Sequence, residues 1–166
     1  METVQAQLGQ KIFSAPSVFN FFQPDYQPIG PVEAADKVAP EFQITNAQTI
    51  AGYMNLVNRW LIYDEMVDDW GRGYEEPYDD NDYPRLDLGD EMALTELEDL
   101  PELIDRLDVI LTHGTLSERT KNEILAMLRD MPTDSYSEQD RIWQRNLRAR
   151  VAIYLILVSP EYLINR

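Results

Sequence analysis

Apolar residues recur at intervals of three and four along several stretches of the chain, which is the spacing of one face of an α-helix. The first stretch follows Thr45 or Asn46, and either residue can cap the start of a helix. Its apolar positions are Ala47, Ile50, Ala51, Met54, Val57 and Leu61. We therefore predict a long helix within residues 45–69.

Two further helices are predicted between residues 99 and 132. The first has Asp99 as a cap, Pro101 near its first position and Gly114 as its stop. Its apolar face consists of Leu100, Leu103, Ile104, Leu107, Ile110 and Leu111. The second begins at Ser117 and ends before Pro132. Its apolar side consists of Ile124, Leu125, Leu128 and Met131.

The last helix begins near Ser137, and its second half contains the longest apolar run, Val151–Val158. One face is formed by Trp143, Leu147, Val151, Tyr154, Leu155 and Val158. Because the second half is apolar all round, we expect other helices to enclose it. With a short helix around residues 90–98, the pattern predicts an all-α fold, a compact bundle of four to five helices. The 166 residues are expected to form a single domain, with the helical remainder over residues 90–166.

Residues 1–44 form an N-terminal arm rich in proline and phenylalanine. We expect an extended path, because proline fixes the backbone and donates no hydrogen bond. Burying a phenylalanine is worth about 1.5–3 kcal/mol. The arm is therefore predicted to lie in the groove between the first and last long helices through four apolar side chains, those of Phe13, Val18, Phe19 and Phe22. The alternative is an exposed strap that docks elsewhere.

Charge and composition exclude several classes of protein. The net charge is −16, and residues 64–99 hold fifteen acidic and two basic residues. Nucleic acid is not an expected partner, because phosphate binding needs a basic surface. The absence of cysteine excludes disulfides, thiolate catalysis and cysteine-ligated zinc. The longest apolar run is far shorter than the roughly 20 residues of a membrane span, and the start of the sequence lacks a signal-peptide pattern.

Residues 70–89 are predicted to form a long acidic loop, because glycine and proline interrupt any helix or strand there. The simplest interpretation is a solvated loop. A second is weak calcium binding through the oxygens of Asp79, Asp80, Asn81 and Asp82, although the spacing is not that of an EF-hand. A third is docking against a basic protein surface, to which aromatic side chains would add contact area. These aromatic residues are Trp70, Tyr74, Tyr78 and Tyr83.

His113 is the single histidine, so a histidine-dependent catalytic or metal role would have to use it. Its position just before Gly114 favours a role at the end of a helix instead. Four arginines, Arg141, Arg145, Arg148 and Arg150, lie on one side of the last helix. They could bind phosphate or sulfate groups, including those of sulfated glycans. We expect instead that some pair with acidic residues, and we hypothesise that they face the acidic loop.

Three stretches of the sequence resemble a known family. The matching residues are Gly9, Gln10, Phe13, Pro16, Ser17, Val18, Phe19, Leu116, Ser117, Thr120, Ser159, Pro160, Glu161 and Tyr162. They resemble the C-terminal part of the bacterial domain-of-unknown-function 1800 proteins. The resemblance implies a periplasmic or extracellular location and a larger protein with a further helical N-terminal region. It implies no activity and no catalytic residues.

The sequence and the resemblance together favour a non-catalytic structural or protein-interaction domain of an exported bacterial protein. One alternative is a fragment of an enzyme or accessory protein that acts on extracellular or cell-surface, sulfated carbohydrate. Another is a weak calcium-binding module, calcium being the one cofactor considered. The expected partner is a basic protein surface or the missing N-terminal region of the family protein.

Overall fold

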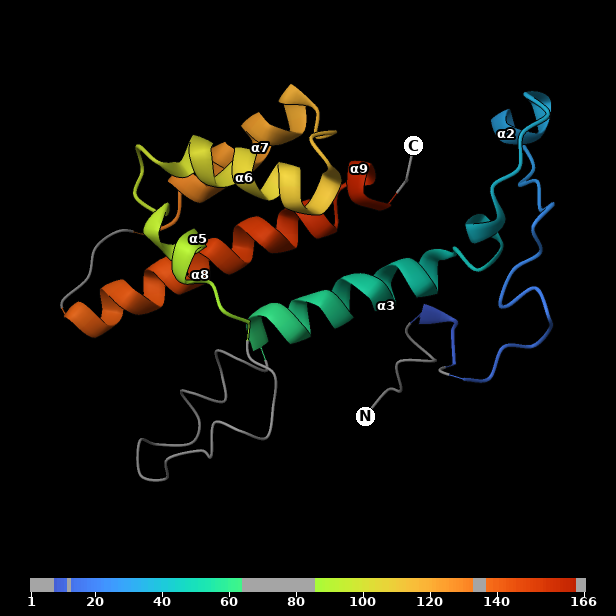
Figure 1. Cartoon of the computed structure of the whole chain (residues 1–166), viewed down its shortest axis with the longest axis horizontal. Coiled ribbons are helices and arrows are strands. Elements are labelled where there is room, and N and C mark those ends of the chain that lie inside the picture. Colours follow the sequence, from blue (N-terminus) through green and yellow to red (C-terminus); the bar gives the residue numbers. More distant parts are fainter. Residues whose placement is uncertain (1–7, 12, 64–85, 133–136, 164–166) are drawn as a thin grey trace. The chain divides into compact units, whose positions relative to one another are not determined.

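The computed structural model describes residues 8–11, 13–63, 86–132 and 137–163 of the chain (Figure 1). Within these ranges the chain is helical and contains no β-strand. The longer helices of the described part are α3 (Ala47–Asn58), α6 (Leu100–Thr112), α7 (Glu118–Arg129) and α8 (Glu138–Leu157). The prediction of an all-α fold is confirmed.

Contacts between residues divide the chain into two compact units, residues 1–57 and residues 58–166. Each unit has its own set of helices and is described by itself. The first contains α2 (Pro31–Ala34), the 3-10 helix η1 (Pro40–Gln43) and nearly all of α3. The second contains the π-helical turn η2 (Arg59–Tyr63), α5 (Gly89–Ala93), α6, α7, α8 and α9 (Pro160–Leu163).

The arm of the first unit is a succession of turns joined by local hydrogen bonds. The amide of Asn20 donates to the carbonyl of Ser17 at 3.1 Å. Further along, the amide of Gln23 donates to Oε1 of Gln43 at 2.7 Å, and the amide of Ala39 donates to the carbonyl of Tyr26 at 2.9 Å. These bonds fold the arm back on itself.

The phenylalanines of the arm are less buried than the sequence predicts. Phe13 is fully exposed, Val18 is 94% exposed and Phe19 is 57% exposed, whereas Phe22 is half-buried. The prediction that these side chains are buried is therefore wrong for the first three. The physical reason is that the turns satisfy their own backbone hydrogen bonds. The left-handed backbone of Phe13, with φ of 55°, belongs to one of these turns.

Asn46 caps α3, as the sequence predicts. Its Oδ1 accepts hydrogen bonds from the amides of Gln48 and Thr49 at 2.9 and 3.0 Å. The predicted apolar face of α3 is only partly correct, since Ile50 and Met54 are exposed while Gly52, Leu56 and Val57 are buried. Gly9 of the arm lies against Thr49, which is one turn from the buried Gly52 on the same side of α3. The arm therefore covers this side of the helix and not the predicted side of Ile50 and Met54.

The core of the second unit lies where α6, α7 and α8 pack on one another, with α5 and η2 against α8. Its fully buried apolar side chains are Leu100, Leu103, Ile104, Leu128, Ala149, Ala152 and Ile156. The predicted face of α6 is confirmed for Leu100, Leu103, Ile104 and Leu107. The prediction is wrong for Ile110, which is 53% exposed.

The predicted face of α8 is wrong. Trp143 is exposed, and Leu147, Val151, Tyr154, Leu155 and Val158 are only half-buried. The buried face consists instead of Arg148, Ala149, Arg150, Ala152, Ile153 and Ile156. Two properties explain this choice. The small alanines let neighbouring helices approach closely, and the arginines reach backbone carbonyls that need donors.

Candidate functional site

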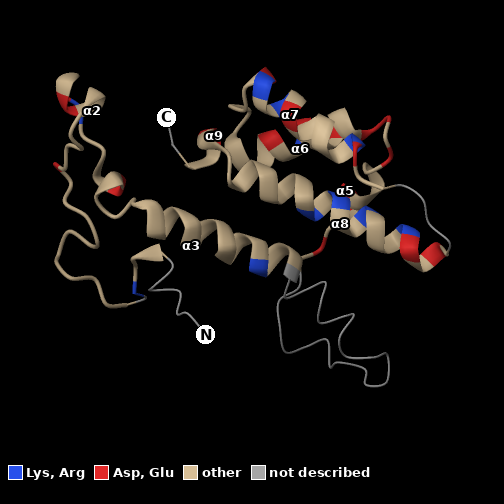
Figure 2. Cartoon of the chain, turned by 180° about the vertical axis from the view of Figure 1, so that it is seen from behind, with Lys and Arg blue, Asp and Glu red and all other residues tan. Residues whose placement is uncertain are grey.

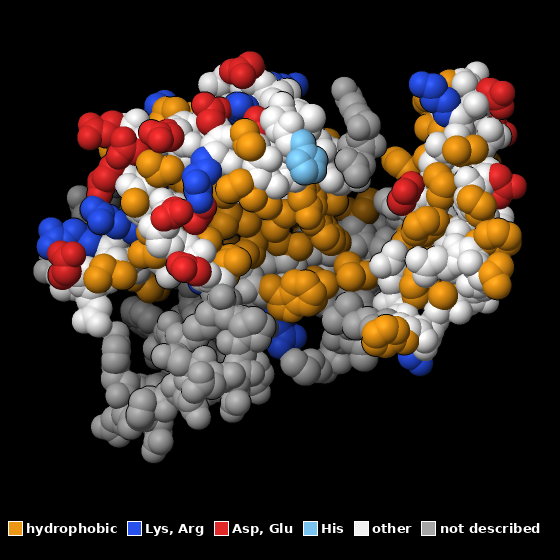
Figure 3. Space-filling model, viewed as in Figure 1, with side chains coloured by type: hydrophobic (Ala, Val, Ile, Leu, Met, Phe, Trp, Pro, Cys, Tyr) orange, Lys and Arg blue, Asp and Glu red, His pale blue; other side chains and the backbone are white. Residues whose placement is uncertain are grey.

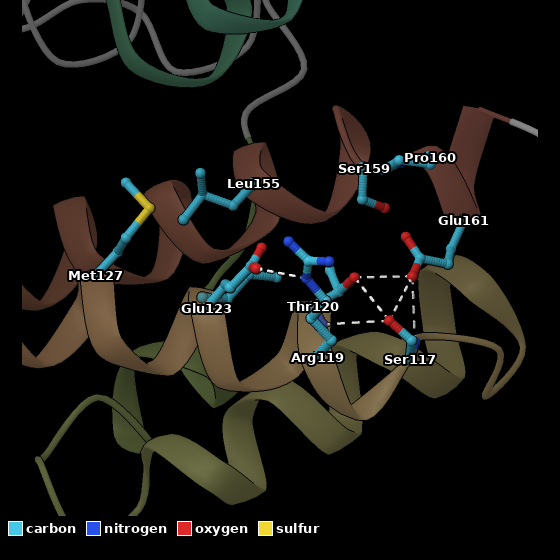
Figure 4. Close-up of a pocket in the computed structure, with 10 residues that line it drawn as sticks. Ser117, Arg119, Thr120, Glu123, Met127, Leu155, Ser159, Pro160 and Glu161 are labelled. Carbon is cyan, nitrogen blue, oxygen red and sulfur yellow. Dashed lines mark hydrogen bonds and ion pairs between the residues drawn. The ribbon is translucent and has the colours of Figure 1, made fainter.

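The start of α7 meets the end of the chain at a cluster of polar side chains (Figure 4). Ser117 caps α7, because its Oγ accepts a hydrogen bond from the amide of Thr120 at 3.2 Å. Glu161, which lies in α9, turns its carboxylate toward the same residues. Its Oε1 accepts from Oγ of Ser117 at 2.7 Å and from Oγ1 of Thr120 at 2.8 Å. The predicted cap at Ser117 is therefore confirmed.

The carboxylate of Glu161 is held in its ionised form. Burial by itself raises the pKa of this group, but the hydrogen bonds from Ser117 and Thr120 outweigh that effect and keep the pKa below its ordinary value. A negative charge also interacts favourably with the positive N-terminal end of a helix dipole. Glu161 thus fastens the chain that follows α8 to the start of α7.

A cavity of about 430 Å³ lies beside this cluster, between α7 and α8. Ser117, Thr120 and Glu161 line its polar end. Its apolar wall is formed by Ile124, Met127, Leu155 and Pro160. At its rim Arg119 donates to Oε1 of Glu123 at 2.8 Å, and both side chains are largely exposed. The second oxygen of Glu161, Oε2, is buried and has no hydrogen-bond partner in the described part of the chain.

A second buried carboxylate, that of Asp108, joins α6 to α7. Asp108 is 3% exposed, and its Oδ1 accepts from Oγ1 of Thr112 at 2.5 Å and from the amide of Leu116 at 3.0 Å. Its Oδ2 lies 2.8 Å from Nζ of Lys121, which also contacts Oδ1 of Asp105 at 2.7 Å. Burial raises the pKa of Asp108, but the bonds from Lys121, Thr112 and Leu116 together lower it below the ordinary value.

Arg148 and Arg150 bind carbonyl groups at the ends of neighbouring elements. Nη1 of Arg148 donates to the carbonyl of Thr95 at 2.8 Å, and Nη2 lies 3.3 Å from the carbonyl of Pro132. Nη1 of Arg150 donates to the carbonyl of Leu61 at 2.8 Å. Burial lowers the pKa of Arg148, and the charge of Glu96 partly offsets this effect. Arg148 therefore places a buried positive charge where α5 and α7 end.

The other two arginines of α8 are exposed and form ion pairs. Arg145 pairs with Glu96, which belongs to the acidic segment 64–99, and Arg141 pairs with Glu138 on its own helix. Figure 2 shows these basic residues along the first half of α8. The hypothesis that they face the acidic loop stays a prediction, as does a binding role for Arg141, Arg145 and Arg148.

His113 ends α6 in the left-handed conformation, with φ of 57°, and the amide of Gly114 donates to the carbonyl of Asp108 at 3.1 Å. This arrangement satisfies free carbonyls at the end of the helix. The imidazole is exposed. The position of His113 thus agrees with the predicted structural role at a helix end.

The proposed calcium and docking residues lie outside the described residues. They are Asp79, Asp80, Asn81, Asp82, Trp70, Tyr74, Tyr78 and Tyr83. Among the residues that the structure does describe, no group of three or more histidine, aspartate or glutamate side chains could hold a metal ion. No described helix is both long enough and apolar enough to cross a membrane.

A comparison with protein families decides the identity of the chain. The model of the family described as "Protein of unknown function (DUF1800)" matches residues 1–164. The chain belongs to the DUF1800 family. No curated protein and no solved structure matches it.

The structure adds a contact that the DUF1800 resemblance does not reveal. Two of the resembling stretches, around Ser117 and around Glu161, are 44 residues apart and form one hydrogen-bonded cluster. The sequence offers Ser117 as a cap, but it contains no local feature that predicts Glu161 as its partner. The buried roles of Asp108 and Arg148 were missed for the same reason, since each depends on groups from other elements.

Proposed function

We propose that the chain is a non-catalytic structural or protein-interaction domain of an exported bacterial protein. The observation that carries the proposal is the exposure of large apolar side chains on helices whose other faces are well packed. On α6, Val109 is 65% exposed and Ile110 is 53% exposed. On α7, Met127 is 55% exposed. Exposed apolar side chains mark a contact with a partner where they form a contiguous patch.

The distribution of apolar surface in the second unit supports the same function. Figure 3 shows hydrophobic side chains gathered on one face of this unit, over α8. In the second half of α8, Val151, Tyr154, Leu155 and Val158 are half-buried. The net charge of −16 favours a partner with a basic surface. The family likeness supports export and, as a further partner, the N-terminal region of a longer family protein.

The polar site supports a structural role more than a catalytic one. Oε1 of Glu161 is engaged by the cap of α7, and both oxygens of Asp108 are engaged by Thr112, Leu116 and Lys121. The sulfated-carbohydrate alternative relies on arginines for binding anions. Arg141 and Arg145 already pair with acidic residues, and Arg148 is buried. No specific contact therefore favours that alternative.

The test is affinity capture from a cell-envelope extract with four forms of the folded chain as bait. The forms are the wild type, V109S/I110S, the chain with the acids of residues 70–89 changed to their amides, and the control E118S. We expect one protein to bind the wild type and E118S and to be lost with V109S/I110S or with the neutralised loop. Equal recovery on every bait would contradict the proposal. So would turnover of a polysaccharide by the wild type that E161Q abolishes.

A further inference from the structure

One end of the outward side of α6 departs from the pattern of a surface helix. A helix that packs one side on a core normally carries polar residues on the opposite side. The buried apolar side of α6 consists of Leu100, Leu103, Ile104 and Leu107. At 3.6 residues per turn Val109 lies opposite that side, yet it is 65% exposed, and its neighbour Ile110 is 53% exposed. The second half of α6 therefore presents apolar side chains that no described residue covers.

The first half of the same side is acidic. Glu102 and Asp105 precede Val109 by seven and four residues, so the three lie on one stripe along the helix. Residues 96–105 contain five acidic residues and no basic one. Figure 2 shows acidic residues in the turn that leads from α5 into α6. One surface thus joins an acidic end to an apolar end.

We call this surface the α6 face. Its residues are Glu98 in the turn before α6, Glu102, Asp105, Val109 and Ile110. Lys121 pairs with Asp105 at 2.7 Å. Glu98 and Glu102 are exposed, and neither forms an ion pair within the described residues. The acidic end therefore keeps carboxylates with which a partner can pair.

The charges of the α6 face select the partner. An anionic membrane surface or a nucleic acid would be repelled by the acidic end. A second copy of the chain would bring the same acids and a net charge of −16, so self-association through this face is opposed. A basic, amphipathic partner satisfies both ends, because its apolar side chains cover Val109 and its lysine or arginine side chains meet Glu102.

The shape of the α6 face favours a helix as the bound element. Its acidic and apolar ends lie two turns apart, which is about 10 Å along the axis of α6. A second helix packs its ridges along such a stripe and presents residues seven positions apart on one side.

We infer that the α6 face binds an amphipathic helix of a partner protein. Apolar residues of that helix lie over Val109 and Ile110, and its lysine or arginine residues lie over the acidic end. This inference rests on the proposed interaction function and names the surface and the kind of element that the partner contributes.

The test is a titration of the isotopically labelled chain with a synthetic amphipathic peptide, followed by the amide NMR signals. The probe consists of leucine and lysine and is about 18 residues long, which is enough to form a helix. We expect saturable shifts centred on the amides of Glu102, Val109 and Ile110. The peptide with serine in place of leucine should show no saturable binding. The peptide with glutamine in place of lysine should bind about three- to tenfold more weakly.

The apolar end is tested by V109S/I110S. This variant should bind the probe about tenfold more weakly, because two apolar side chains no longer leave water on binding. Both positions are exposed, so the fold should be kept. The matched control is I142S, at a 51% exposed position on α8, and it should bind the probe as the wild type does.

The acidic end is tested by E98Q/E102Q, which should weaken binding about three- to tenfold. E118Q/D130N removes the same number of charges from the two ends of α7 and controls for general attraction to an acidic protein. It should weaken binding less than about twofold. At about 1 M salt the effect of E98Q/E102Q should disappear, because the Debye length falls to about 3 Å.

Equal affinity of the probe for the wild type and V109S/I110S, or an equal loss in I142S, would overturn the inference. So would an equal loss in E98Q/E102Q and E118Q/D130N. A dimer of the wild type in sedimentation equilibrium that V109S/I110S dissociates would also contradict it, because a second copy would then occupy the face.

The capture experiment distinguishes failure of this inference from failure of the proposed function. A partner that is lost with the neutralised loop but is captured equally by V109S/I110S and E98Q/E102Q would overturn the helix site and leave the interaction function standing. Saturable binding of the probe at the α6 face without any captured partner would support the site and count against the interaction function.

Discussion

Replacing Asp108 by asparagine removes a buried charge that joins α6 to α7. The charge-assisted bond to Lys121 contributes about 1.5–3 kcal/mol, and the bonds from Thr112 and Leu116 to a neutral amide oxygen are weaker than those to a carboxylate. We therefore expect D108N to lower the free energy of unfolding by about 2–4 kcal/mol. Asparagine has nearly the same shape as aspartate, so little of this loss comes from packing.

The matched control is D105N. Asp105 contacts the same lysine at 2.7 Å, but its side chain is 68% exposed. Exposed ion pairs contribute about 0–1 kcal/mol, so D105N should be nearly neutral. Urea unfolding followed by circular dichroism measures both variants. At about 2 kcal/mol per molar urea, D108N should move the midpoint down by about 1–2 M. Equal losses for the two variants, or a loss below about 0.5 kcal/mol for D108N, would refute the role of burial.

Three further predictions concern the helix ends and pH. H113G should raise the free energy of unfolding by about 0.5–1 kcal/mol, because glycine adopts the left-handed conformation of residue 113 without strain. The control H113A should show no such gain, which would show that the backbone is responsible. R148M should lower the free energy of unfolding by about 2–4 kcal/mol, because it leaves buried carbonyls without a donor. The exposed control R141M should lower it by less than about 0.5 kcal/mol. Thermal unfolding that ranks the two variants otherwise would be inconsistent with the buried position of Arg148. The pKa values of Asp108 and Glu161 are both lowered in the folded chain. The stability that these carboxylates contribute is therefore complete above their unfolded pKa values of about 4 and is lost as the pH falls through the folded pKa values. D108N/E161Q should lose stability less steeply than the wild type between about pH 5 and pH 3, and an unchanged slope would argue against a contribution from these two groups.

Features that depend on neighbouring residues were predictable from the sequence. Asn46, Ser117 and Ser137 cap their helices because a cap requires only a short polar side chain and the next turn of backbone. Asp99 stands at the start of α6 but makes no capping bond, so even local features depend on side-chain orientation. The apolar face of α6 was mostly recognisable because four of its leucine and isoleucine side chains point into one core.

Features that depend on distant groups were not predictable. The buried face of α8 includes Arg148, which is stabilised by the carbonyls of Thr95 and Pro132 from two other parts of the chain. No spacing within α8 identifies such acceptors. Similarly, the exposed Phe13 and Val18 follow the apolar pattern of the arm, but the pattern does not reveal whether another surface covers them.

Glu161 fastens α9 to the start of α7 through Thr120 and Ser117. A double-mutant cycle of T120V and E161A tests this claim most directly, because valine keeps the shape of threonine and the cycle isolates the contact to Oε1 from the one that the Thr120 hydroxyl makes with Ser117. We predict a coupling free energy of about 1–2 kcal/mol, against additivity within about 0.5 kcal/mol for the control pair T120V and E123A. A coupling between Thr120 and Glu161 no larger than that of the control pair would contradict the claim.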